Sequence, residues 1–139
     1  MSPERTGRPA RSVCRTVADK LQWERMPADE YLLRHYEAAN GKRPFAEWLW
    51  LLSDRNADAA ARVQTRLDRL RLGNFGDARS LGKGLSELRI DIGPGYRVYF
   101  MVEDSSAVVL FCGGDKSTQQ KDIRRARKYL TDYRRRPDA

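Results

Sequence analysis

The stretch Ser86–Ile123, SELRIDIGPGYRVYFMVEDSSAVVLFCGGDKSTQQKDI, decides the fold because three strand patterns follow one another in it. Apolar and polar residues alternate over Glu87–Ile92 and again over Tyr96–Val102, and Ala107–Cys112 is almost wholly apolar. Alternation of period two predicts strands with one face in the core and one in water, and the apolar run predicts the most buried strand. The intervening turns are short, so we expect an antiparallel meander.

A turn at Gly113-Gly114 is predicted to end the meander, and a basic helix follows it. Ser117 is predicted to cap this helix, with Gln120 completing a capping box. Residues 116–136 hold nine basic and two acidic side chains, a net charge of +7 against +8 for the whole chain. Such a local patch of charge favours a polyanion or an acidic protein as its partner. The apolar stripe of this helix comprises Ile123, Ala126, Leu130 and Tyr133.

The first half of the domain has the pattern of a scaffold. A short strand is predicted over Tyr31–Tyr36, and Pro44 suits the first turn of a helix. Asn56 can cap a second helix, which the glycines between residues 73 and 76 end. The two helices are expected to form an antiparallel hairpin that covers the sheet. Their apolar positions are Phe45, Trp48, Leu49 and Leu52 in the first, and Ala60, Val63, Leu67 and Leu70 in the second.

Length and composition favour one cytoplasmic domain of modest size. The chain has 139 residues and two cysteines, which form no disulfide framework, and it has no apolar run of membrane-spanning length. We therefore predict no membrane association. Residues 1–27 are basic and poor in periodic apolar positions, so they are predicted to be a disordered N-terminal extension. The folded domain is predicted to cover residues 28–136.

Three cations of the meander form the candidate site. Arg89 and Arg97 occupy strand positions, and Lys116 lies just past the third strand, so we expect them at the sheet surface as a phosphate-binding set. An alternative from the residues alone is that Arg97 pairs with Glu87 or Asp91 across the turn. The sequence contains no metal-ligand or nucleotide-binding motif, so no cofactor is expected.

The runs GLSELRIDIGPGYRVYF and LFCGGDKSTQQKDIRRA resemble the addiction-module killer proteins, HigB-like members of the RelE/ParE superfamily of bacterial toxins. The resemblance covers roughly residues 31–133. It implies an α+β fold with the order β-α-α-β-β-β-α. In that fold a helical hairpin packs on a small, mainly antiparallel sheet, and a basic helix ends the chain.

The same resemblance implies a function. The chain would be the toxin of a bacterial type II toxin–antitoxin module, a metal-independent endoribonuclease that cleaves mRNA on the ribosome and so inhibits translation. Arg97, Lys116 and Arg89 would be the catalytic cations. The expected partner is a helix-turn-helix antitoxin, with operator DNA bound only through the toxin–antitoxin complex. Contacts to RNA would come from Lys121, Arg124, Arg125 and Lys128.

Two other functions stay open. Gyrase-poisoning ParE-like toxins share the fold without nuclease activity, and a non-catalytic subunit that binds DNA with its antitoxin is a third reading. Several ribosome-dependent relatives carry a Tyr or His near the start of the last helix, and residues 117–122 contain neither. The general acid and base are therefore unassigned, with Glu87 and Asp91 as candidates. His35 is expected to be structural, and Trp48 or Trp50 is expected to anchor the antitoxin.

Overall fold

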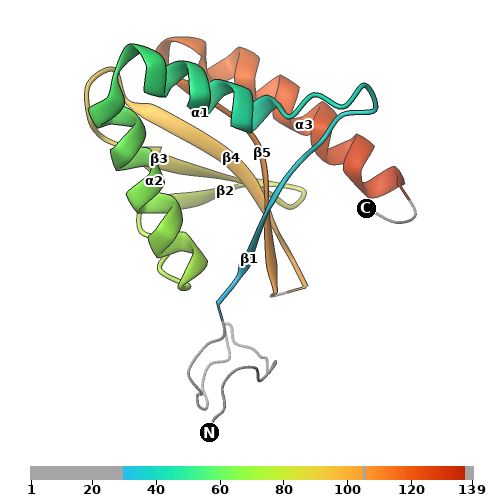
Figure 1. Ribbon diagram of the computed structural model, residues 1–139. Coiled ribbons are helices and arrows are strands. Elements are labelled where there is room, and N and C mark those ends of the chain that lie inside the picture. The colour runs from blue at the N-terminus through green and yellow to red at the C-terminus, as the bar shows by residue number, and fades with distance from the viewer. Residues whose placement is uncertain (1–29, 105, 137–139) are drawn as a thin grey trace, which may run out of the picture.

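The computed structural model describes residues 30–104 and 106–136, and these residues form an α+β fold (Figure 1). The predicted N-terminal extension, residues 1–27, lies outside the described residues. A short 3-10 turn, Lys116–Thr118, precedes the last helix. The elements in chain order are β1 (Leu32–His35), α1 (Pro44–Arg55), α2 (Ala57–Arg71), β2 (Ala78–Gly82), β3 (Leu85–Ile90), β4 (Tyr96–Glu103), β5 (Ala107–Asp115) and α3 (Gln119–Arg135).

The five strands form one mixed, open sheet in the order β1-β5-β4-β3-β2. β1 pairs in parallel with β5, and the other neighbours are antiparallel. The meander of β3, β4 and β5 and the strand β1 agree with the predicted elements. Strand β2 was not predicted, because five residues that include Ser80 and Gly82 carry little strand signal.

Both local helix signals in the scaffold are present. Pro44 begins α1, where its missing N–H costs no helical hydrogen bond. The Asn56 side chain accepts a hydrogen bond from the Ala59 amide over 3.1 Å and caps α2. Among the described residues, no helix is long and apolar enough to cross a membrane.

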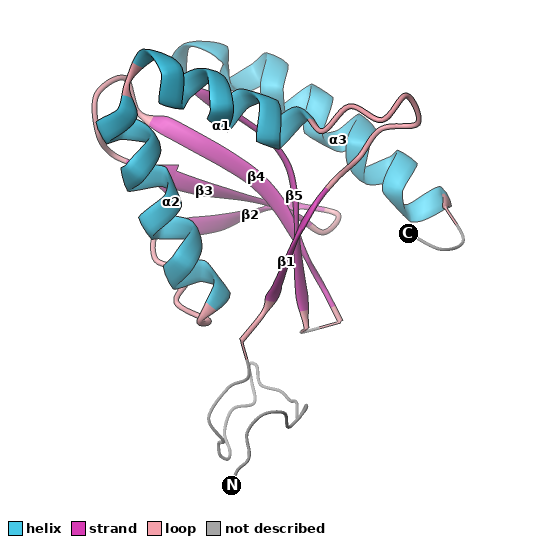
Figure 2. Cartoon of the chain, viewed as in Figure 1, coloured by secondary structure: helices cyan, strands magenta, loops and turns pink. Residues whose placement is uncertain are grey.

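Helices cover both faces of the sheet (Figure 2). α1 and α2 pack on one face, where Val98 and Phe100 of β4 and Leu110 of β5 lie in their core. α3 packs on the other face against Tyr99 and Met101. The prediction that the strands keep one face in water was therefore wrong, because α3 returns over that face and buries it.

Strand β5 continues through the two glycines that were predicted to form a turn. A β-carbon at Gly113 would overlap the indole ring of Trp48 in α1. A β-carbon at Gly114, on the other face, would overlap the Asp122 carboxylate of α3 and lie 2.9 Å from Thr118 Oγ1. The missing side chains thus let α1 and α3 approach the same strand from opposite sides.

The last helix begins differently from the prediction. Asp115, not Ser117, is the side-chain cap, and it caps the 3-10 turn that leads into α3: its Oδ1 accepts from the Ser117 amide over 2.8 Å, and Thr118 completes the box. Thr118 holds the N-cap position of α3 itself without a side-chain capping hydrogen bond. α3 then starts at Gln119. The predicted apolar stripe is correct, with Ala126, Leu130 and Tyr133 buried and Ile123 half-buried. A carboxylate also suits the positive end of a helix, which explains why aspartate takes the capping position.

The close approach at Gly114 predicts that Gly114→Ala destabilises the protein. The added methyl group must displace the Asp122 side chain or the first turn of α3, and overpacking of this kind costs about 1–3 kcal/mol. Chemical denaturation followed by circular dichroism measures the change. Leu32→Ala, at a side chain that is 56% exposed, is the control and should change stability by about 0.5 kcal/mol at most. A Gly114→Ala protein as stable as this control would contradict the packing argument.

Candidate functional site

Strand register brings the predicted catalytic arginines together. Arg89 of β3 lies directly opposite Arg97 of β4, and Arg97 lies opposite Gly114 of β5. The neighbouring row on the same face contains Arg79 of β2, Glu87 of β3 and Tyr99 of β4. These two rows form a polar cluster at the side of the sheet that faces the start of α3.

Arg97 is buried, which corrects its predicted place at the sheet surface. Its side chain is only 6% exposed, and its Nε is buried without a hydrogen-bond partner. Within residues 30–104 and 106–136 its guanidinium makes no hydrogen bond or ion pair. The Nε of Arg89 is likewise buried and unpartnered. Like charges directly opposite each other destabilise a sheet, so this pair favours the presence of an anion.

Glu87 does not neutralise Arg97, contrary to the alternative considered from the sequence. Its carboxylate is fully buried and engaged at both oxygens. Oε1 accepts from Arg79 Nε over 3.1 Å, and Oε2 accepts from Gln119 Nε2 over 2.8 Å. A carboxylate so enclosed cannot touch a substrate atom in this conformation, so its role is to position Arg79 and Gln119. Asp91, the other candidate base, is exposed beyond the end of β3.

The hydroxyl group of Tyr99 is the third buried polar atom of the cluster that makes no hydrogen bond of regular geometry, although it lies close enough to the Glu87 carboxylate to interact with it. Burial raises the pKa of Tyr99 well above its usual range, and the neighbouring Glu87 carboxylate raises this pKa further. Tyr99 therefore stays protonated at physiological pH. Because its ring is fully buried, the hydroxyl is no more accessible to a substrate than Glu87.

Lys116 lies beyond the end of β5, in the 3-10 turn that leads to α3, and its side chain is exposed. Asp115, its neighbour in the chain, pairs with Tyr96 at the start of β4. A β-carbon built at Gly95 would lie 3.7 Å from the Cβ of Lys116. The structure thus places Lys116 at the same end of the sheet as Arg97, beside the β3–β4 turn.

The four predicted RNA-binding residues of α3 differ in their surroundings. Lys121, Arg124 and Lys128 are exposed. Arg125 instead folds back on its own helix, where Nη1 lies 3.3 Å from Asp122 Oδ1 and Nη2 lies 3.4 Å from the Tyr129 hydroxyl. The exposed residues can meet a polyanion directly, whereas Arg125 would have to leave these contacts.

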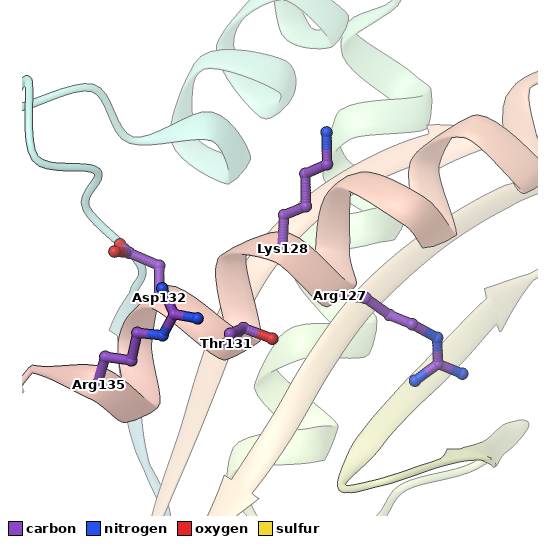
Figure 3. A pocket seen from close by; sticks show the side chains of 5 residues that line it. All are labelled: Arg127, Lys128, Thr131, Asp132 and Arg135. Carbon is purple, nitrogen blue, oxygen red and sulfur yellow. The ribbon is translucent and has the colours of Figure 1, made fainter.

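Two further arginines of α3 donate hydrogen bonds to backbone carbonyl groups at the β2–β3 turn. Arg127 donates to the carbonyl groups of Leu81 over 2.6 Å and Gly82 over 3.4 Å, and Arg134 donates to that of Lys83 over 3.0 Å. Figure 3 shows Arg127 and Lys128 leaving the helix in different directions. Both residues line a shallow hollow of about 400 Å³. The other residues lining this hollow are Thr131, Asp132 and Arg135.

His35 lies on the edge strand β1, which β5 separates from β4. Its ring packs against Phe45 with centroids 5.6 Å apart. Partial burial lowers the pKa of His35, and the charge of Arg43 lowers this pKa further. The position of this histidine therefore agrees with a structural role and separates it from the arginine cluster.

Sequence reasoning missed Arg79 and Gln119. Arg79 was overlooked because β2 was not predicted, so nothing aligned it with Glu87. Gln119 follows the capping segment directly, and only the true start of α3 turns its amide toward β3. Among the described residues, no group of histidine, cysteine, aspartate and glutamate side chains could hold a metal ion.

Comparison with known proteins finds an uncharacterized relative. The chain is 51% identical over 78 residues to an uncharacterized protein from Haemophilus influenzae, and the match covers 56% of this chain and 79% of that protein. The chain belongs to the same family as that protein. No family model matches the chain.

The surroundings of three tyrosines predict that their hydroxyl groups ionise late, at high pH, in an alkaline titration. Burial and the Asp132 carboxylate raise the pKa of Tyr36 to about 12, and burial also raises the pKa of Tyr99 and of Tyr133. An unfolded tyrosine ionises near pH 10. Tyr36 therefore stabilises the fold fully below about pH 10, and this contribution is lost as the pH rises toward about 12.

Phenolate absorbance near 295 nm, recorded as the pH is raised, measures this late-titrating class. Tyr99→Phe should remove one tyrosine from the late-titrating class. If Tyr99→Phe leaves the late amplitude unchanged, the hydroxyl at position 99 is not in the buried environment described above.

Proposed function

We propose that this chain, a member of the family that the Haemophilus influenzae protein represents, is the toxin of a bacterial type II toxin–antitoxin module. It would act in the cytoplasm as a metal-independent endoribonuclease that cleaves mRNA on the ribosome. We place it with the HigB-like proteins of the RelE/ParE superfamily. Support for that placement comes from the resemblance of the meander sequence and from the α+β arrangement of two successive helices, a sheet and a basic last helix (Figure 1).

The observation that carries the proposal is a pair of facing arginines that make no ion pair within residues 30–104 and 106–136. Arg97 and Arg89 face each other on adjacent strands, and Lys116 lies at the same end of the sheet. A scissile phosphate gains negative charge in its transition state, and fixed cations in a site with little water stabilise that charge strongly. Because Arg97 is nearly enclosed, the phosphate would approach from the side of Arg89 and Lys116.

The chemistry needs few groups from the protein. The 2′-hydroxyl next to the scissile phosphate is the nucleophile, and its attack expels the 5′-oxygen of the following nucleotide. The products are a 2′,3′-cyclic phosphate, or a 3′-phosphate after hydrolysis, and a 5′-hydroxyl end. In the described conformation Glu87 and Tyr99 are buried, so they support the cations and do not exchange protons with RNA. The ribosome would supply orientation and complete the proton transfers.

We expect expression of this chain without a partner to stop growth by blocking translation. Incorporation of labelled amino acids should fall before DNA synthesis does, and new 5′-hydroxyl RNA ends should accumulate in mRNA. Sequencing of 5′-hydroxyl ends beside an assay for gyrase-linked DNA breaks measures both. If DNA breaks appear first, the proposed ribonuclease activity is wrong and the protein is a gyrase poison. If neither lesion appears but operator DNA is bound with a partner, the chain is a regulatory subunit.

The matched variant for this experiment is Arg97→Met. Methionine fills a similar volume without charge, so removal of the unpaired buried cation should leave stability unchanged or raise it. Loss of one preorganised cation should nevertheless cost about 2.7–4 kcal/mol in the reaction, on the order of a hundred- to a thousandfold in rate. A folded Arg97→Met protein that still cleaves mRNA at the normal rate would remove Arg97 from the site.

The proposed partner is a helix-turn-helix antitoxin that brings the complex to operator DNA. Support for its anchor comes from the exposure of the tryptophans. Trp48 is half-buried against the core and against Gly113, whereas Trp50 is 71% exposed beside Leu51, which is 53% exposed. Exposed aromatic side chains of this kind often dominate binding energy. Trp50, and not Trp48, is therefore the expected anchor.

Trp50→Ala should weaken antitoxin binding by about 2 kcal/mol or more, roughly thirtyfold, without reducing mRNA cleavage. Isothermal titration with the proposed antitoxin, sought as a helix-turn-helix protein encoded beside the gene, measures the affinity. Leu72→Ala is the matched control, because Leu72 is a 60% exposed apolar residue at the far end of α2. Equal affinities for the two variants would place the anchor elsewhere.

A further inference from the structure

We infer that Arg79 is a further RNA-binding residue, which holds a phosphate next to the scissile one and is oriented by the buried carboxylate of Glu87. This inference rests on the proposed function, because it concerns the same site. It extends the site to β2, a strand that carries none of the predicted catalytic residues.

Strand register places Arg79 on the correct face. Arg79 lies opposite Glu87, and Glu87 lies opposite Tyr99, so all three side chains share the face that carries Arg89 and Arg97. Arg79 and Arg89 are diagonal neighbours on adjacent antiparallel strands, a relationship that separates their α-carbons by about 7–8 Å. The two guanidinium groups are therefore close enough to serve one strand of RNA.

The ion pair with Glu87 fixes one end of the Arg79 guanidinium and leaves the other free. Nε of Arg79 donates to Glu87 Oε1 over 3.1 Å. The Glu87 side chain is fully buried, whereas that of Arg79 is 56% exposed. Through residues 30–104 and 106–136 the two Nη atoms of Arg79 make no hydrogen bond. A guanidinium held in this way presents a rigid pair of N–H donors, which suits a phosphate.

Glu87 also connects this arginine to the start of α3. Its second oxygen accepts from Gln119 Nε2 over 2.8 Å, so β2, β3 and the helix meet at one carboxylate. A buried carboxylate without such partners would be costly, and truncating a partner of a buried charge is strongly destabilising. Arg79 is thus preorganised by an interaction that the fold itself requires.

The cations span more of the sheet than one phosphate can occupy. Lys116 follows β5, Arg97 lies on β4, Arg89 on β3 and Arg79 on β2. Neighbouring strands lie about 4.8 Å apart, so the distance from β5 to β2 is about 14 Å. A single phosphate contacted by Arg97 and Arg89 leaves Arg79 for the adjacent phosphate of the same strand. The ligand class is therefore single-stranded RNA with at least two consecutive phosphodiesters.

The test measures binding of the purified full chain to a fluorescent 2′-O-methyl RNA oligonucleotide, which lacks the nucleophile for cleavage. Anisotropy titrations at several salt concentrations give both the affinity and the salt slope. Arg79→Gln is the sharpest variant, because the glutamine Nε2 occupies the chain position of the arginine Nε. It can keep the hydrogen bond to Glu87 while it removes the charge and both Nη donors.

Arg79→Gln should lower the affinity about tenfold and reduce the salt slope by about one, as expected for the loss of one phosphate contact. Arg79→Ala should show at least the same loss, and a thermal melt reports any destabilisation of this variant separately. Arg62→Ala is the control, because Arg62 is an exposed cation on α2 at the opposite face of the sheet. It should leave both quantities nearly unchanged.

The variants separate failure of the inference from failure of the proposed function. If Arg97→Met weakens binding but Arg79→Gln behaves like Arg62→Ala, the site binds RNA without Arg79 and the inference is overturned. If Arg97→Met also binds like the control, or the unaltered chain does not bind the oligonucleotide, the RNA site itself is rejected. Weakening by both Arg97→Met and Arg79→Gln, with a reduced salt slope for the latter, supports the inference.

Discussion

The close contact of two helices with one strand organises this protein. At Gly113 and Gly114 strand β5 has no side chains, so Trp48 of α1 and the first turn of α3 reach its backbone from opposite faces. The sheet thereby becomes the middle layer of the fold. The same contact sets the start of α3, which determines where Lys116 leaves the sheet and where Gln119 meets Glu87. A side chain at either glycine would displace the elements from which the polar cluster is built.

Charge placement in the cluster opposes stability. Two arginines face each other on neighbouring strands, and the two buried carboxylates beside them have other partners: Glu87 is bound to Arg79 and Gln119, and Asp122 to Thr118 and Arg125. Enclosed cations without counter-ions are unfavourable, and a protein keeps such an arrangement where a ligand relieves it. The rest of the structure must offset this cost. The apolar packing on both faces of β4 and β5 is the evident source, because these strands are buried along nearly their whole length.

Local sequence patterns predicted much of the architecture. The proline at α1, the asparagine cap of α2 and the alternation in the meander each act within a few residues, and each appears in the structure. Strand positions selected Arg89, Arg97 and Lys116 as a candidate phosphate site, and the resemblance implied their catalytic role; the fold brings the three to one end of the sheet. The α+β fold class was thus accessible from the amino-acid sequence alone, whereas the catalytic role of these cations stays a prediction.

The errors share one physical origin, which is contact between distant segments. Alternation in β4 could not reveal that α3 covers its second face, so Arg97 was expected in water. Gly113-Gly114 has the sequence pattern of a turn, and only its contacts with α1 and α3 explain why β5 continues through it. Strand β2 has a weak pattern of its own and exists through its pairing with β3, so Arg79 could not be aligned with Glu87. Residues fixed by tertiary contact were therefore those that sequence reasoning missed.

The parallel pairing of β1 with β5 has a consequence for the order of assembly. Leu32, near the start of the described fold, pairs with Ala107, and α1, α2 and three strands lie between them in the chain. Closing so long a loop costs entropy that local contacts do not offset, so this pairing is expected late in folding. During synthesis, β1 can pair only after β5 has been made, and the polar cluster can form only after the start of α3 has been made. The nascent chain would therefore contain the arginines of the polar cluster before the contacts that position them exist. Only the completed fold would have the arrangement that the proposed activity needs.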